Sequence, residues 1–219
     1  MPTFGLIAEG PTDHVVLENI LVGYFNDPDL TQSIRELQPL RDATDAVKNF
    51  GGWYNVFEYC KSELFRDAFI QNDYLLIQID TDCSSEPHYD VPRAKDESIE
   101  YFIERIITKF RTMILERFGE VFYQKYEQKI LFAISVDEIE CWLLPLYYDN
   151  KTRSSTNNCL YKLNQKLATE NLKPIVPEHK DYKTYQKISR QFQKPKTLKN
   201  CYPHNPSFNY FVLNFLEKL

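Results

Sequence analysis

The sequence contains no long hydrophobic run and no recognisable targeting segment. None of its apolar stretches approaches the roughly 18 consecutive residues that a membrane-spanning helix needs, so no membrane partner is expected. The N-terminus, MPTFGLIAEG, has no basic start and reaches a carboxylate early, unlike a secretory signal peptide. A hydrophobic fraction of 43% argues against disorder. We therefore expect a globular protein of the cytoplasm.

Cysteine and histidine occur without the spacings that would give them a role. The five cysteines are odd in number and form no CxxC pair, so we expect neither a zinc site nor a disulfide framework. Cys60 and Cys141 stand among apolar residues and are expected in the core. The four histidines are dispersed, and each is expected to be a surface or locally hydrogen-bonded residue.

Charge is distributed unevenly along the chain. Residues 1–150 carry 13 Lys and Arg against 27 Asp and Glu, a balance of −14, whereas residues 151–200 carry 12 against 3, a balance of +9. Tyr182 and Tyr185 stand among the lysines of this basic block, a composition that suits a nucleic-acid backbone and stacked bases. A solvated lysine-rich face has the same composition, so both interpretations stay open.

Short apolar segments alternate with helical patterns over the first 150 residues. Strands are expected at residues 4–8, 33–40, 73–82 and 129–135. Helices are expected from an N-cap at Thr12, over 53–69 and over 97–118. Nearly continuous apolar strands are typical of a parallel sheet covered on both faces. The alternation predicts an α/β fold, a Rossmann-like, mainly parallel sheet flanked by helices.

From about residue 150 the strand signals fade. The rest of the chain is rich in Lys, Tyr, Asn and Pro and is expected to form short helices and loops. We predict an α/β catalytic domain over residues 1–150 and a basic, mostly helical C-terminal extension over 151–219 that packs on it. The closing amphipathic segment is expected to dock on the core through Phe208, Phe211, Val212, Phe215 and Leu216.

Acidic residues follow three of the expected strands. Glu9 follows the first, Asp80 and Asp82 end the third, and Glu138 or Glu140 follows the fourth. Because ligands of open parallel sheets bind at the carboxyl ends of the strands, these side chains are expected at one edge. Gathered carboxylates repel one another unless a cation neutralises them, and oxygen-rich surroundings suit Mg²⁺ or Mn²⁺.

Each carboxylate also has an ordinary structural interpretation. A single acidic residue after a strand is often an N-cap or a solvated loop charge. Asp13 fits a first-turn helix acid stabilised by the helix dipole, yet four residues after Glu9 it is also within reach of the same ion. The combination, rather than any one residue, indicates a site.

The order of these motifs resembles the Toprim fold shared by topoisomerases, primases and OLD-family nucleases. EGPTD opens a helix after an apolar strand, a later apolar strand ends in DTD, and SVDEIECWLL follows the next strand. The pattern, with the closing NPSFNYFVLNFL, is also similar to small bacterial Toprim-like proteins associated with mobile elements or anti-phage defence. The motifs cover residues 4–145, and the basic tail only loosely.

The resemblance implies a set of site residues. Glu9 matches a strand-end glutamate that is a metal ligand or general acid–base group, and Asp80 belongs to the metal-binding DxD. A lysine near the scissile phosphate is also implied, and Lys194 and Lys196 are candidates on charge alone. The implied ligands for Mg²⁺ or Mn²⁺ are Glu9, Asp13, Asp80, Asp82 and one or both of Glu138 and Glu140.

We therefore predict a metal-dependent nuclease that cleaves nucleic acid, DNA rather than RNA, held by the basic 151–200 segment. One alternative is a non-catalytic Toprim-fold effector that binds a partner protein, and a less favoured one is a phosphatase with Asp80 as nucleophile. The chain has no G-x-x-x-x-G-K-[ST] loop, so the ATPase found in OLD proteins would have to come from another protein. A homodimer stays open, because apolar helical stripes that face a core or a second copy look alike.

Overall fold

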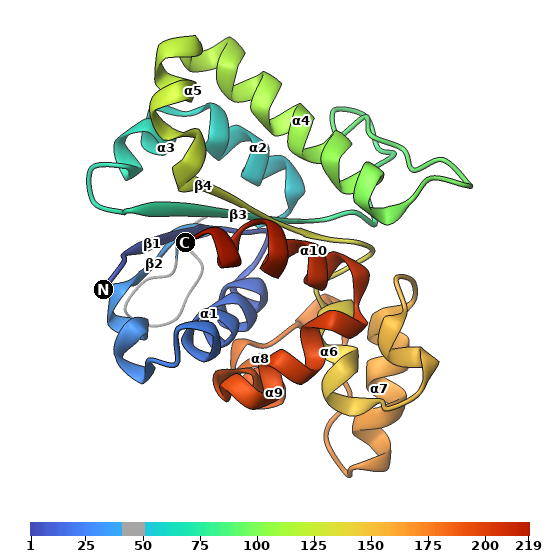
Figure 1. Ribbon diagram of the computed structural model, residues 1–219. Coiled ribbons are helices and arrows are strands. Elements are labelled where there is room, and N and C mark those ends of the chain that lie inside the picture. Colours follow the sequence, from blue (N-terminus) through green and yellow to red (C-terminus); the bar gives the residue numbers. More distant parts are fainter. Residues whose placement is uncertain (41–50) are drawn as a thin grey trace.

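A four-stranded, all-parallel sheet lies at the centre of the protein (Figure 1), whose computed structural model describes residues 1–40 and 51–219. The strand order is β2-β1-β3-β4. The strands are β1 (Phe4–Ile7), β2 (Ile34–Gln38), β3 (Tyr74–Asp80) and β4 (Ile130–Ser135). The four expected strands and the parallel α/β fold are confirmed, with boundaries within a few residues of the prediction.

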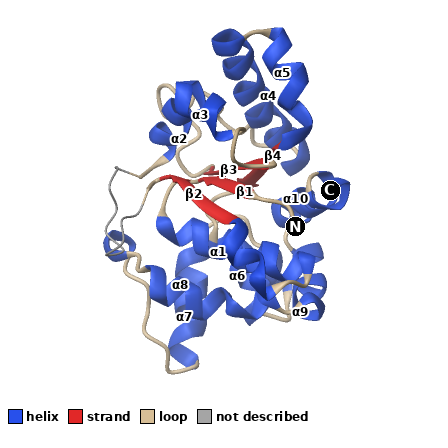
Figure 2. Ribbon diagram, turned by 90° about the vertical axis from the view of Figure 1, so that its left-hand side faces the viewer, coloured by secondary structure: helices blue, strands red, loops and turns tan. Residues whose placement is uncertain are grey.

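Helices cover both faces of this sheet. They are α1 (Pro11–Phe25), α2 (Trp53–Lys61), α3 (Glu63–Ala68), α4 (Ile99–Phe118), α5 (Glu120–Tyr126), α6 (Glu140–Tyr147), α7 (Cys159–Thr169), α8 (Tyr182–Ser189), α9 (Pro195–Cys201) and α10 (Pro206–Asn214). Figure 2 shows α2 to α5 on one side of the strands, with α1, α6, α7, α8 and α9 on the other. The C-terminal region is mostly helical, as predicted. Within the described ranges, no helix is both long and apolar enough to cross a membrane.

Two apolar cores lie on opposite faces of the sheet, because successive strand residues point to opposite sides. In β3, Leu75 and Ile77 belong to the core under α2 to α5. Leu76 belongs to the other core, which contains residues of α1 and of the C-terminal helices. The strand is thereby buried on both faces, which explains its nearly continuous apolar run.

Two local expectations are corrected. The helix expected over 53–69 is broken at Ser62, whose extended backbone (φ −87°, ψ 159°) separates α2 from α3. Thr12 is not an N-cap, because Gly10 takes that position and Pro11 begins α1. Proline suits the first helical position, where its missing N–H is not needed. Asp13 consequently lies in the first turn of α1.

The C-terminal segment packs back onto the sheet side occupied by α1. Trp142 of α6 stacks on Phe208 of α10 with ring centroids 4.8 Å apart. Its indole Nε1–H donates to the Ser207 hydroxyl over 2.9 Å. Aromatic rings with a satisfied polar handle are effective core anchors. The expected docking of this segment is confirmed, since Phe208, Phe211, Val212 and Leu216 are buried and Phe215 packs partly buried against them.

Candidate metal centre

The carboxyl ends of β1 and β3 and the start of α1 meet at one edge of the sheet. Glu9 lies just after β1, Asp80 is the last residue of β3, and Asp13 is in the first turn of α1. All three line one cavity of about 350 Å³, together with Lys180. Asp13 and Asp80 are buried, so their carboxyl groups are largely removed from water. The structure thus brings together three of the carboxylates that the sequence singled out.

Hydrogen bonds from β3 fix Glu9 relative to Asp80. The backbone N–H of Asp80 donates to Oε1 of Glu9 over 2.7 Å. The side chain of Gln78 accepts from the backbone N–H of Glu9 over 3.3 Å and donates to Oδ1 of Asp80 over 2.8 Å. Gln78 is fully buried, and its amide therefore sets the spacing of both acids. Sequence reasoning missed it, although an isolated glutamine within the apolar run YLLIQID was the available signal.

The Gly51–Gly52 pair allows the chain to pass close to Glu9. A side chain at Gly51 would place its Cβ 2.3 Å from the carbonyl oxygen of Glu9. The N–H of Gly52, a residue with φ 99°, donates to that same oxygen over 2.7 Å. Only glycine combines the close approach at the first position with an easy positive φ at the second. Gly52 lines the cavity, and Gly51 packs against the backbone of Glu9.

Glu140 begins α6 and is fully buried beside the cavity's lysine. Its Oε1 accepts from Lys180 Nζ over 2.7 Å and from the Tyr185 hydroxyl in a short hydrogen bond. Its Oε2 has no hydrogen-bond partner among the described residues. A buried carboxylate oxygen without a partner is costly, so this atom has the capacity to accept a further donor or a cation.

Glu138 lies at the same edge but is held by a different helix. Its Oε1 accepts the backbone N–H of Leu160 in α7 over 2.6 Å, and its Oε2 lies 3.9 Å from Lys180 Nζ. Glu138 and Glu140, the two candidate metal ligands that follow β4, therefore both contact Lys180. Glu140 is the more buried of the two, while Glu138 is half-buried.

The clustered carboxyl groups hold protons strongly. Burial and the neighbouring Asp13 carboxylate together raise the pKa of Glu9 to about 8, against the lowering effect of the hydrogen bond from the Asp80 N–H. Burial raises the pKa of Asp13 to about 6 and that of Asp80 well above its usual range. Burial and the neighbouring Glu140 raise the pKa of Glu138 to about 7. These groups cannot all ionise at neutral pH without more positive charge than the structure supplies.

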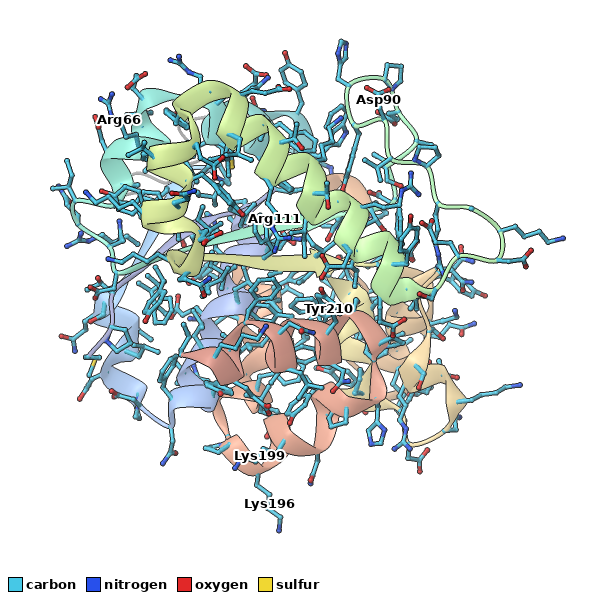
Figure 3. All side chains as sticks on the ribbon, turned by 45° about the horizontal axis from the view of Figure 1, so that its top comes forward. Arg66, Asp90, Arg111, Lys196, Lys199 and Tyr210 are labelled. Atoms are coloured by element: carbon cyan, nitrogen blue, oxygen red, sulfur yellow. A yellow bond between two sulfur atoms is a disulfide. The ribbon has the colours of Figure 1, made fainter. Side chains whose placement is uncertain are left out.

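Among the described residues that line the cavity, Lys180 supplies the positive charge. Burial by itself lowers its pKa, but the carboxylates of Glu140, Asp13 and Asp80 together outweigh that effect, and the net pKa lies above the usual range. The ammonium group is therefore charged at neutral pH. Apart from its membership of the basic block, nothing in the sequence marked Lys180 for this role. The two predicted lysines lie elsewhere: Lys194 lines a separate shallow cavity with Arg190, and Lys196 projects outward from α9 (Figure 3).

Asp82 is placed differently from Asp80. Its side chain is exposed, and Oδ1 accepts the backbone N–H of Cys83 over 2.8 Å. It lies outside the residues that line the cavity, although its charge contributes to raising the pKa of Glu9. The turn after β3 thus directs one acid of the DxD pair inward and leaves the other on the rim.

The cysteine spacing indicated no disulfide framework, but the structure contains one disulfide. Cys141 and Cys159 are bonded, with their Cα atoms 5.0 Å apart. The pairing depends on α6 and α7 lying side by side, which the spacing of the cysteines does not reveal. Cys60 and Cys141 are both buried, as expected.

The strand-end carboxylates do not form a closed cage. Over residues 1–40 and 51–219, Asp137, Cys141 and Cys159 are the only group of three or more potential metal ligands whose ligating atoms all lie within 4.8 Å of one another. The donors of the Glu9 cavity are oxygens, the ligand type that Mg²⁺ and Mn²⁺ prefer, and their open arrangement leaves room for water and phosphate oxygens. The residues therefore fit such an ion.

Comparison with known proteins identifies no relative. No family model matches the chain, and neither a curated protein nor a solved structure matches it.

Proposed function

We propose that this protein is a Toprim-type nuclease whose strand-end carboxylates bind Mg²⁺ or Mn²⁺ and hydrolyse phosphodiester bonds of nucleic acid. The observation that carries the proposal is the convergence of Glu9, Asp13 and Asp80 on one cavity at the carboxyl edge of a parallel sheet. Ligands of such sheets bind at this edge. Among the described residues that line the cavity, Lys180 carries the one ammonium group, so a divalent cation would relieve the repulsion that remains between the three acids.

The partner-free oxygen of Glu140 supports a further cation beside this cavity. Lys180 and Tyr185 occupy the other oxygen of Glu140, so Oε2 is left for a ligand. The first ion would meet the carboxylates of Glu9, Asp13 and Asp80, and the further ion would meet Oε2 of Glu140 in α6. When bound, Mg²⁺ or Mn²⁺ supplies Lewis-acid stabilisation of a phosphoryl oxygen and lowers the pKa of a coordinated water.

Side chains of the protein would carry out proton transfer and stabilise the charge on the phosphate. Glu9, whose Oε1 is held by the N–H of Asp80, presents its carboxyl group to the cavity and is placed to exchange a proton with the attacking water. Lys180, a charged donor that lines the cavity, is placed to stabilise charge on the phosphate. Gln78 keeps Glu9 and Asp80 in register. The lysine role expected for Lys194 or Lys196 thus passes to Lys180 in this proposal.

The basic 151–200 segment is the proposed contact for the nucleic-acid backbone. Lys196 and Lys199 project outward from α9 (Figure 3), as residues that contact phosphate from a surface would. Such contacts would hold DNA without reading its sequence, and binding would weaken as salt rises.

The test compares purified wild-type protein with Asp80→Asn and Asp96→Asn on supercoiled plasmid, single-stranded DNA and RNA. Asp96 is an exposed loop acid and is the matched control. We expect cleavage with Mg²⁺ or Mn²⁺, none with EDTA, a loss of about 100-fold or more in Asp80→Asn, and full activity in Asp96→Asn. Equal cleavage by Asp80→Asn and wild type would refute the proposal.

A non-catalytic effector is the second candidate, because Lys180 already forms an ion pair with Glu140 in this acidic cluster. A lysine that replaces a cation would suit a module that binds a partner protein without turnover. This candidate predicts no metal-dependent cleavage of any nucleic acid and no change in stability on adding Mn²⁺.

A further inference from the structure

A disulfide joins the candidate site to the C-terminal helices. Cys141 directly follows Glu140 in α6, and Cys159 is the first residue of α7. Both side chains are fully buried. The bond therefore ties the helix that carries Glu140 to the beginning of the helix that packs beside it.

Two acids of the loop before α6 are held by the N-terminus of α7. The backbone N–H of Leu160 donates to Oε1 of Glu138 over 2.6 Å. The N–H of Cys159 lies 3.4 Å from Oδ2 of Asp137. Both N–H groups belong to the first turn of α7, where the helix offers no partner of its own. The position of Glu138 therefore depends on where the start of α7 is held.

The same loop supports the turn that follows Asp80. The carbonyl oxygen of Asp137 accepts the backbone N–H groups of Thr81 and Asp82 over 2.9 and 3.0 Å. The N–H of Asp137 donates to the Thr81 hydroxyl over 2.9 Å. A continuous set of bonds thus runs from the disulfide through Asp137 to the DxD turn.

We propose that the Cys141–Cys159 disulfide is a redox-controlled brace of the carboxylate site. When intact, it holds the start of α7 against Glu138 and Asp137; when reduced, it releases them and loosens the site. The effect on metal binding rests on the proposed function, whereas the release of the loop does not. In a compartment where thiols are kept reduced, a disulfide is more often a sensing element than a permanent link.

A dithiol can reduce the Cys141–Cys159 disulfide in two thiol–disulfide exchange steps. A thiolate of the dithiol attacks one sulfur and the S–S bond breaks, giving a mixed disulfide and one cysteine thiolate. The second thiolate of the dithiol then releases the other cysteine. Two electrons and two protons are transferred in total, which leaves two cysteine thiols and one disulfide in the oxidised reductant.

The surroundings provide both access and acceptors for the reduced sulfurs. Cys159 follows the exposed Asn157 and Asn158, so local opening of this loop exposes it without unfolding the sheet. Cys141 Sγ lies 3.8 Å from Oδ2 of Asp137, and Cys159 Sγ lies 3.6 Å from the carbonyl oxygen of Ser155. Each thiol formed on reduction therefore has a nearby acceptor, and the dithiol state satisfies the hydrogen-bonding capacity of both groups.

The first test measures the effect of the disulfide on the structure in the absence of metal. Alkylation of denatured protein should find three free thiols before treatment with dithiothreitol, those of Cys60, Cys83 and Cys201, and five after it. Hydrogen–deuterium exchange should then become about tenfold faster or more in peptides covering residues 137–143 and 158–163, and stay unchanged in α4. The double variant Cys141→Ser/Cys159→Ser should match the reduced protein and ignore the reductant. Five free thiols in the untreated, air-oxidised protein, or unchanged exchange after reduction, would overturn the proposal.

The second test uses Mn²⁺ alone as the probe. The dissociation constant of Mn²⁺ should rise about fivefold or more on reduction, and return when the protein is reoxidised. Cys201→Ser, which removes a buried thiol outside the bond, should keep the full response. Equal affinity in the oxidised and reduced proteins contradicts the coupling. If neither form binds Mn²⁺, the result counts against the proposed function. The hydrogen–deuterium exchange measurement still tests whether the disulfide holds the loop before α6.

Discussion

The backbone N–H of Asp80 donates to the carboxylate of Glu9 over 2.7 Å, so the ends of β3 and β1 are joined by a side chain that belongs to the candidate site. This bond favours the ionised form of Glu9, whereas burial and the neighbouring Asp13 favour the protonated form and prevail. Glu9 is therefore a carboxyl group whose charge depends on what else enters the cavity. A divalent cation would change the balance toward ionisation.

The stability of the metal-free protein should fall as the pH rises from 5 to 8. The pKa values of Asp13, Glu138 and Glu9 are raised to about 6, 7 and 8 in the folded state, so the folded protein binds more protons than the unfolded chain over this range. Their contribution to stability is present below the unfolded pKa values and is lost as the pH passes through the folded ones. We expect the Tm to drop by about 5 °C or more in EDTA, measured by scanning calorimetry.

Glu9→Gln is the matched control for that pH dependence. Glutamine keeps the shape of the side chain and its oxygen for the Asp80 N–H but cannot ionise. The variant should be at least as stable as wild type at pH 8 without metal, and its Tm should depend less on pH between 6 and 8. If the Tm of Glu9→Gln changes with pH as steeply as that of the wild type, the Glu9 carboxyl group is not the source of the pH dependence.

Lys180→Met should remove most of the activity and also destabilise the acidic cluster. It leaves Glu140 buried with a lost ion pair and removes the charge that lowers the pKa values of Asp13 and Asp80. We expect a drop in cleavage of about 100-fold and a Tm loss that is larger at pH 8 than at pH 5.5. Lys183→Met changes an exposed lysine of α8 and serves as the control.

The comparison extends to Lys194→Met and Lys196→Met. These variants should weaken nucleic-acid binding slightly and reduce its salt dependence, without a large loss of the cleavage rate at saturating substrate. A loss of 100-fold in either of them, with activity kept in Lys180→Met, would return the catalytic role to the lysines that the sequence first suggested.

Gly51→Ala should disturb the site through the backbone of Glu9. Its Cβ would lie 2.3 Å from the Glu9 carbonyl oxygen, so the chain has to move there. We expect a lower Tm and an Mn²⁺ affinity reduced about fivefold or more. Gly119→Ala is the control, because it is strained by φ 82° but has open space around it at the junction of α4 and α5. It should lower the Tm and leave Mn²⁺ binding unchanged, as calorimetric titration would show.

The sheet and the acids at its edge could be predicted because their signals are local. Each buried strand is a short apolar run, and the acids stand within a few residues of its end. Parallel pairing then brings Glu9 and Asp80 together without further information. The break at Ser62 was missed because both of its flanks carry helical apolar spacing, and only the extended conformation of one residue separates α2 from α3.

Lys180 and the disulfide could not be predicted because they depend on how distant helices pack. Lys180 precedes α8, and it meets Glu140 only because α8 lies against α1 and α6. Many lysines in the basic block carry the same charge, and nothing in their spacing distinguishes this one. Cys141 and Cys159 are 18 residues apart with no motif, and their pairing follows from the contact between α6 and α7.

Titration of Mn²⁺ into wild-type protein, Glu9→Gln, Asp80→Asn and Asp96→Asn at pH 7.5 tests the central claim most directly. The account predicts saturable binding to wild type and Asp96→Asn, and an affinity at least about tenfold weaker in Glu9→Gln and Asp80→Asn while both remain folded. No saturable binding to the wild type, or equal binding by all four folded proteins, would contradict a metal site at the strand ends.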